Sequence, residues 1–110
     1  YFYMFYSGFT YCNASYGVGI ARSHSPLGPF TRRSAPILHS NGTWAGPGHN
    51  SFVRAGGVPY LVYHAWDAPH VCSDGGSRKL MLDRIRWSGG WPVINNGTPS
   101  VTARPAPRVP

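Results

Sequence analysis

Acidic side chains are the usual agents of hydrolytic chemistry, and this chain has few of them. Asp67, Asp74 and Asp83 are the only acids among its 110 residues, and glutamate is absent. A reaction with a general acid and a general base on two sides of one bond would use nearly all of them. We expect Asp67 to cap a turn rather than contact a ligand, and Asp83 to pair with an arginine on an adjacent strand. No catalytic residue is assigned within this sequence.

The basic residues give the chain a formal net charge of +7 without forming a cluster. Nine of the ten are arginines, spread along the chain with no run longer than two. Because nucleic-acid-binding proteins usually gather their basic residues on one face, we expect no nucleic-acid partner. A basic module that binds nucleic acid or an acidic glycan is kept as a third hypothesis. No run approaches the ~18 apolar residues of a membrane helix, so no membrane partner is expected.

The elements that would position these residues are short strands. Runs rich in aromatic and β-branched residues alternate with turns rich in Gly, Pro, Asn and Ser, and they predict strands at residues 1–6, 16–22, 30–33, 51–54, 60–66, 80–87 and 91–94. We expect the first strand to be buried on both faces. No window has the 3.6-residue period of a helix, so the sequence predicts an all-β chain that ends in a Pro-rich extended tail at residues 99–110.

A weak internal repeat organises the strands. Tyr3-Met-Phe-Tyr-Ser7 returns about sixty residues later as Tyr60-Leu-Val-Tyr-His64, Ile20-Ala-Arg22 returns as Leu82-Asp-Arg84, and Gly28-Pro-Phe30 returns loosely as Gly90-Trp91-Pro92. Strand, loop, strand, turn and short outer strand is the order of a β-propeller blade. We predict two consecutive blades within residues 1–98, an incomplete one at 1–35 and a last one at 46–96. Since about three or more repeats are needed for a stable core, we expect a piece of a larger propeller.

Seven short segments carry the most specific information. They are Tyr3-Met-Phe-Tyr-Ser-Gly8, Tyr16-Gly-Val-Gly-Ile-Ala-Arg-Ser23, Ser25-Pro-Leu-Gly-Pro-Phe30, Pro36-Ile-Leu38, Gly46-Pro-Gly-His-Asn-Ser51, Tyr60-Leu-Val-Tyr-His-Ala-Trp-Asp67 and Gly89-Gly-Trp-Pro92. In this order they resemble the C-terminal part of a glycoside hydrolase of family 43. The resemblance implies a five-bladed β-propeller and a secreted, extracellular enzyme that acts on arabinose- or xylose-containing plant polysaccharide.

The resemblance also implies where the catalytic groups lie. Family members invert the anomeric carbon with an Asp base, a second Asp that tunes the acid, and a Glu acid, with the acid and base about 6.5–9.5 Å apart. The Glu belongs to a Glu-Gly-Pro motif just before a strand that resembles Tyr1–Tyr6. We therefore expect all three groups upstream of residue 1, and the isolated 110 residues to be inactive. The alternative is a non-catalytic, carbohydrate-binding propeller remnant.

The resemblance assigns possible roles to three further residues. In relatives, the His equivalent to His49 helps to hold an ion in the central channel, often calcium, whose oxygen ligands would come mostly from water; the alternative is a His that only bonds within a glycine-rich turn. The loops at 7–15 and 66–78 correspond to the substrate rim, where Arg78 is expected to bond sugar hydroxyls. Trp66 either stacks on a sugar or packs in the core, whereas Tyr11 is expected to be only a loop residue.

The same loops carry the two cysteines. Cys12 and Cys72 occupy equivalent places in successive blades, so a single disulfide and two free thiols are both open, with the disulfide depending on secretion. Three Asn-x-Ser/Thr sequons begin at Asn13, Asn41 and Asn96, all in predicted loops. They predict N-glycosylation in a eukaryotic secretory pathway, with chance occurrence as the alternative. The remaining partners implied are an oligo- or polysaccharide substrate and the other propeller blades of the same chain.

Overall fold

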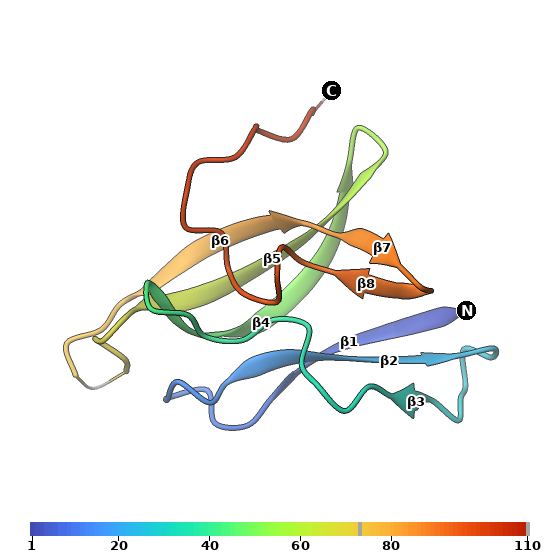
Figure 1. Cartoon of the computed structure of the whole chain (residues 1–110), viewed down its shortest axis with the longest axis horizontal. Coiled ribbons are helices and arrows are strands. Elements are labelled where there is room, and N and C mark those ends of the chain that lie inside the picture. The colour runs from blue at the N-terminus through green and yellow to red at the C-terminus, as the bar shows by residue number, and fades with distance from the viewer. Residues whose placement is uncertain (73, 110) are drawn as a thin grey trace.

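The computed structural model describes residues 1–72 and 74–109, and its described residues form strands and no helix. One sheet contains β1 (Phe2–Gly8), β2 (Gly17–Ser23) and β3 (Thr31–Arg32), in that order. A second contains β4 (Trp44–Ala55), β5 (Val58–Asp67) and β6 (Arg78–Arg84), and β7 (Arg86–Ser88) pairs with β8 (Trp91–Val93) in a hairpin (Figure 1). All pairs are antiparallel. The all-β prediction is confirmed, and no helix able to cross a membrane occurs among these residues.

The core is built mainly from the central strands of the two larger sheets. Val18 and Ile20 of β2 are fully buried, as are Leu61 and Ala65 of β5. The two residues of each pair are an even number of positions apart, so their side chains point to the same face of the sheet. Further core side chains, from the segments between and after the sheets, are Ile37, Leu38, Ile85 and Ile94. The cluster is continuous, so the two sheets share one core.

The first strand is less buried than its sequence predicts. β1 was expected to be covered on both faces, but Phe2 and Met4 are 49% and 45% exposed. The alternate side chains of Tyr3 and Phe5 pack against the core. The prediction is wrong because β1 is an edge strand, paired with β2 on one side and covered on one face.

The strands of the second sheet also differ from prediction. β4 begins at residue 44 rather than 51, with register shifts on both sides of Gly48. Residues 80–87, predicted as one strand, divide at Ile85. This side chain is 1% exposed, and its N–H donates to the Pro59 carbonyl. Pairing with β5 ends after β6, and the next residues form β7, which pairs with β8 instead. Residues 99–109 form no strand, as expected for the tail.

Candidate functional site

Two loops meet at one edge of the molecule. Residues 9–16 join β1 to β2, and residues 68–77 join β5 to β6; both lie at the left end of Figure 1. A disulfide between Cys12 and Cys72 joins them, with their Cα atoms 5.1 Å apart and 60 residues apart in sequence. Equivalent loops of the two repeats are therefore one covalently joined unit.

The disulfide lies beside an arginine held between two aromatic rings. The guanidinium carbon of Arg78 is 4.9 Å from the ring centre of Trp66 and 5.6 Å from that of Tyr11. An arginine over an aromatic face is attracted by the negative face of the ring system. Tyr11 was expected to be only a loop residue, and its contact with Arg78 was missed because sequence gives no measure of distance between the loops. Arg78 is exposed, so its N–H groups can reach a ligand.

Trp66 belongs to the packed interior of this edge. It is 6% exposed, and its Nε1 has no hydrogen-bond partner among the described residues. A Cβ on Gly76 would lie 2.9 Å from its ring and 2.1 Å from the His70 carbonyl oxygen, and a Cβ on Gly46 would lie 3.3 Å from the ring. Of the two roles left open by the sequence, core packing is therefore the one its burial favours, with Arg78 covering the indole.

His49 lies in the bulged part of β4 and contacts both repeats. Its backbone has a φ of 52°, and its N–H donates to the Ser7 hydroxyl at 2.8 Å. Its ring centre is 5.8 Å from that of His64. His64 was not among the predicted site residues, although the internal repeat aligns it with Ser7. The alignment of His64 with Ser7 in the repeat was the sequence signal that could have identified it, since both residues contact His49.

The environment of His64 favours its neutral form. The ring stacks on Tyr16, with ring centres 6.1 Å apart, and its Nδ1 is buried without a partner among the described residues. Burial lowers the pKa of His64, and the positive charges of Arg78 and His49 lower it further. A neutral imidazole keeps a nitrogen lone pair free to accept a hydrogen bond or to bind a metal.

The residues around His49 fit only part of a calcium site. No group of three or more His, Cys, Asp or Glu side chains that could hold a metal occurs within the described part of the chain. Calcium takes six to eight oxygen ligands. Two side-chain oxygens lie close to His49: the Ser7 hydroxyl, which accepts the His49 N–H, and the Asn50 side-chain oxygen, which accepts from that hydroxyl at 2.7 Å. An ion here would therefore need most of its ligands from water or from residues outside this set.

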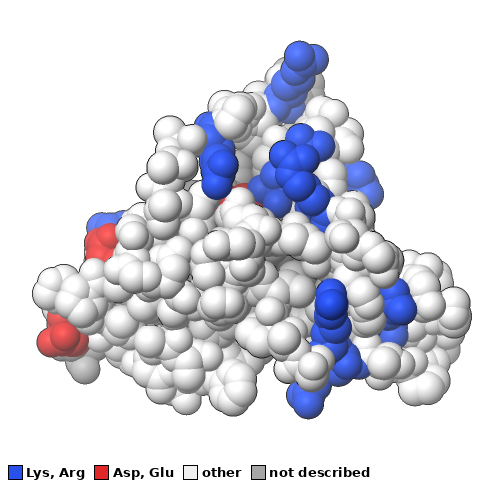
Figure 2. All heavy atoms as spheres, in the orientation of Figure 1, with Lys and Arg blue, Asp and Glu red and all other residues white. Residues whose placement is uncertain are grey.

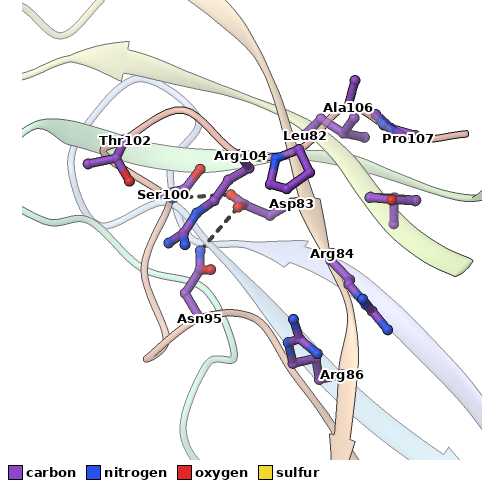
Figure 3. Close-up of a pocket in the computed structure, with 12 residues that line it drawn as sticks. Leu82, Asp83, Arg84, Arg86, Asn95, Ser100, Thr102, Arg104, Ala106 and Pro107 are labelled. Carbon is purple, nitrogen blue, oxygen red and sulfur yellow. Dashed lines mark hydrogen bonds between the residues drawn. The ribbon is translucent and has the colours of Figure 1, made fainter.

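Asp83 lies in a separate pocket, and within the described part of the chain it forms no ion pair with an arginine. It is 3% exposed and accepts hydrogen bonds from the Tyr63 hydroxyl (2.6 Å), the Asn95 side-chain amide (3.1 Å) and the Ser100 N–H (3.2 Å). The predicted pair with an arginine on an adjacent strand is wrong, because the buried carboxylate faces inward and is bonded by Tyr63, Asn95 and Ser100 instead. Figure 3 shows the carboxylate between Asn95 and Ser100. It lines a pocket of about 450 Å³ between β6 and the tail. Burial, and then the bond to Asp83, raise the pKa of Tyr63.

The other predicted residues have individual surroundings. Asp67 forms an exposed ion pair with Lys79, with 3.7 Å between Nζ and Oδ2, and its carbonyl accepts the His70 N–H in a turn. Asn13 and Asn96 are exposed. The side-chain nitrogen of Asn41 donates to the Pro99 carbonyl at 3.0 Å, and its oxygen accepts two backbone N–H groups. The side-chain amide nitrogen of Asn41, the atom that would carry a glycan, is therefore already hydrogen-bonded.

Most of the chain matches a model of a known protein family. The family model for glycosyl hydrolases family 43 matches residues 1–92. The chain belongs to glycoside hydrolase family 43. The resemblance carried by the seven segments is thereby confirmed. The two loops joined by the disulfide are therefore part of a family 43 protein.

Curated relatives of this family 43 chain are extracellular enzymes. It is 35% identical to an extracellular endo-α-(1→5)-L-arabinanase of Bacillus subtilis, covering 73% of this chain and 25% of that protein. It is 30% identical to an extracellular exo-α-(1→5)-L-arabinofuranosidase of Cellvibrio japonicus, covering 86% of this chain and 30% of that protein. The chain thus spans between a quarter and a third of the length of these two relatives.

Solved structures give the architecture. A thermostable family-43 glycoside hydrolase superposes with a TM-score of 0.84 at 31% identity, over 98% of this chain and 35% of that one. An α-L-arabinanase of Cellvibrio cellulosa, solved in complex with arabinohexaose, superposes with a TM-score of 0.72 at 29% identity, over 84% of this chain and 32% of that one. These neighbours are five-bladed β-propellers, and the family 43 chain has the all-β fold of part of such a propeller.

Proposed function

We propose that this chain is the C-terminal portion of an inverting O-glycosyl hydrolase that acts on arabinose- or xylose-containing plant polysaccharide. Its catalytic acid and base lie upstream of residue 1. The observation that carries this proposal is the family 43 match together with coverage of only a quarter to a third of the arabinan-acting relatives. The absence of glutamate from the sequence supports it, because the family's acid is a glutamate.

Two outward surfaces are suited to the remaining blades. Phe2 and Met4 are exposed on β1, and Leu80 and Leu82 are 83% and 38% exposed on β6. Contiguous exposed apolar side chains are uncommon on a finished surface and mark faces that pack on something else. In this proposal each surface packs on a neighbouring blade of the same protein, which completes the ring.

The site at the two loops forms part of the substrate rim. Arg78 donates hydrogen bonds to sugar hydroxyls from its exposed edge, and its contacts with Trp66 and Tyr11 help to hold the guanidinium group in place. His49 would help to hold an ion, with water supplying most of the ligands, and such an ion would supply positive charge near the rim. The disulfide of Cys12 and Cys72 keeps the rim assembled outside the cell, where disulfides persist. Extracellular relatives support this location.

The test uses the protein expressed at the full length of its gene. Hydrolysis of α-1,5-arabinan or of xylan, with inversion followed by NMR of the released sugar, is expected from it, whereas the 110 residues alone are expected to be inactive. Turnover by the pure 110-residue chain, or no turnover of either polysaccharide by the full-length protein, would overturn the proposal.

The role of Arg78 is tested within the same protein. Arg78→Ala removes charge-assisted bonds to the substrate, so kcat/KM is expected to fall by about tenfold or more. Arg54→Ala is the matched control, because Arg54 also lies over an aromatic ring, 5.6 Å from that of Phe52, at a site outside the rim. Equal losses in both variants would contradict a specific role for Arg78.

The ion is tested by stability. Removal of calcium with a chelator is expected to lower the Tm of the full-length protein, and calcium is expected to restore it. In His49→Ala this difference is expected to shrink. An unchanged response to chelation in His49→Ala would remove this residue from the ion site.

A further inference from the structure

A second group of aromatic and arginine side chains lies at the opposite edge from the joined loops. It is formed by strands β1 and β2, the segment after β3, and the β7–β8 hairpin. We call it the Arg22–Trp91 patch and define it by Tyr1, Tyr3, Arg22, Arg33, Trp87 and Trp91.

Two arginines share one indole in this patch. The guanidinium carbon of Arg22 lies 4.0 Å from the ring centre of Trp91 and 4.1 Å from that of Tyr1, and Arg33 approaches the Trp91 ring at 5.3 Å. Guanidinium groups stack on aromatic faces and leave their N–H edge for planar anions such as carboxylate. The patch thus gathers two cations around one indole, and both carry N–H donors.

The patch is fixed and open to solvent. The Nη1 atom of Arg22 donates to the Gly90 carbonyl at 2.9 Å, and the Tyr3 hydroxyl donates to the same oxygen. The ring centres of Tyr3 and Trp87 are 4.8 Å apart. Trp87 is 46% exposed and Arg33 is exposed. Aromatic faces held in this way can stack on the apolar face of a sugar ring without a large loss of side-chain entropy.

The charge of the patch is not balanced by acids. Among the described residues the one ion pair is Lys79 with Asp67. Asp83 is buried and already accepts three hydrogen bonds. Figure 2 shows the exposed acids at the far left of the molecule and basic side chains at the lower right. Because neighbouring cations repel, an anionic ligand at this edge is favoured over a neutral one.

We propose that the Arg22–Trp91 patch binds uronate-bearing polysaccharide. A carboxylate meets the free edges of Arg22 and Arg33, and a neighbouring sugar ring lies on the exposed indole of Trp87. The ligand class follows from this combination of aromatic faces and unbalanced guanidinium groups. This proposal rests on the proposed function in one respect, namely that the partner is a polysaccharide. The patch would hold the protein on acidic polymer while the rim engages neutral chains.

The experiment is affinity electrophoresis of the full-length gene product in gels that contain polygalacturonate, neutral arabinan or polyuridylate. Retardation by polygalacturonate is expected, and it should weaken as salt is added, because salt screens exposed charges. Arg33→Gln is expected to weaken the apparent affinity for polygalacturonate by up to about fivefold, the upper end of the range for one exposed ion pair. Arg54→Gln is the control, since it removes an equal charge from an arginine that also lies over an aromatic ring.

Each outcome decides something. Loss in Arg33→Gln with no loss in Arg54→Gln supports the patch. Equal behaviour of the two variants, or no retardation by polygalacturonate, overturns it. Stronger retardation by polyuridylate would assign the patch to single-stranded nucleic acid, which aromatic and arginine side chains also bind, and would overturn the uronate proposal. Hydrolysis of neutral arabinan by the unmodified protein is measured separately, so failure of the proposed function is distinguishable from failure of the patch.

Discussion

Replacement of Asp83 by alanine tests whether this carboxylate is structural. Asp83 is 3% exposed, and three donors converge on it from β5 and from the segment after β8. Asp83→Ala leaves all three without their acceptor. In the full-length gene product we expect a lower free energy of unfolding, while the control Asp74→Ala, which removes an exposed acid, is expected to change it by less than about 0.5 kcal/mol.

The magnitude follows from the burial of each donor. The Tyr63 side chain is 1% exposed, so its orphaned hydroxyl loses its partner without access to water, at about 1–3 kcal/mol. Asn95 is exposed and Ser100 is half-buried, so both can turn to water and add less. Asp83→Ala is therefore expected to cost about 2–4 kcal/mol.

The assay is urea unfolding at pH 7, followed by tryptophan fluorescence, for the parent, Asp83→Ala, Tyr63→Phe and the double variant. If the Tyr63–Asp83 bond is the main contribution, the double variant is expected to cost less than the sum of the single changes by about 1.5–3 kcal/mol. The slope of unfolding free energy against urea should stay constant across the four proteins, since they expose similar surface on unfolding.

One result would refute this reasoning. A coupling energy below about 0.5 kcal/mol would mean that Tyr63 and Asp83 behave as independent sites. Asp83 would then owe its burial to the apolar surroundings alone, and the argument that it is a hydrogen-bonded structural carboxylate would fail.

Three further predictions concern the same protein. The double change Cys12→Ser and Cys72→Ser removes a disulfide between residues 60 apart in sequence and is expected to lower the free energy of unfolding by about 4 kcal/mol in urea without reductant. Adding reductant should not destabilise this double variant further, because it has no disulfide left to reduce. Gly48→Ala would place a Cβ 1.9 Å from a tyrosine ring and is expected to lower the unfolding free energy by about 1–3 kcal/mol, whereas Gly42→Ala, with open space around it, should change it little in the same assay. Burial and the bond to Asp83 raise the pKa of Tyr63, so the unfolded chain loses the phenolic proton at a lower pH than the folded chain does. The free energy of unfolding should therefore fall as the pH rises above about 10. In thermal melts at several pH values, Tyr63→Phe should make that fall less steep.

The sequence by itself determined the fold class, the family and most of the strands. Alternating apolar residues, the sixty-residue repeat and the Gly46–Ser51 segment are local patterns, and local patterns are what sequence records directly. The shortage of acids, which composition records without reference to folding, is the basis of the prediction that this chain holds no complete two-carboxylate site.

Only the tertiary structure decided how these segments meet. Exposure of Phe2 depends on what covers β1, the turn at Ile85 depends on a core position, and the partners of Asp83 come from residues distant in sequence. The placement of Arg78 between Trp66 and Tyr11 requires two loops that are far apart along the chain. Burial and long-range contacts arise from packing between elements, and the same local pattern permits several of them. The site is therefore a property of the assembled sheets rather than of any one segment.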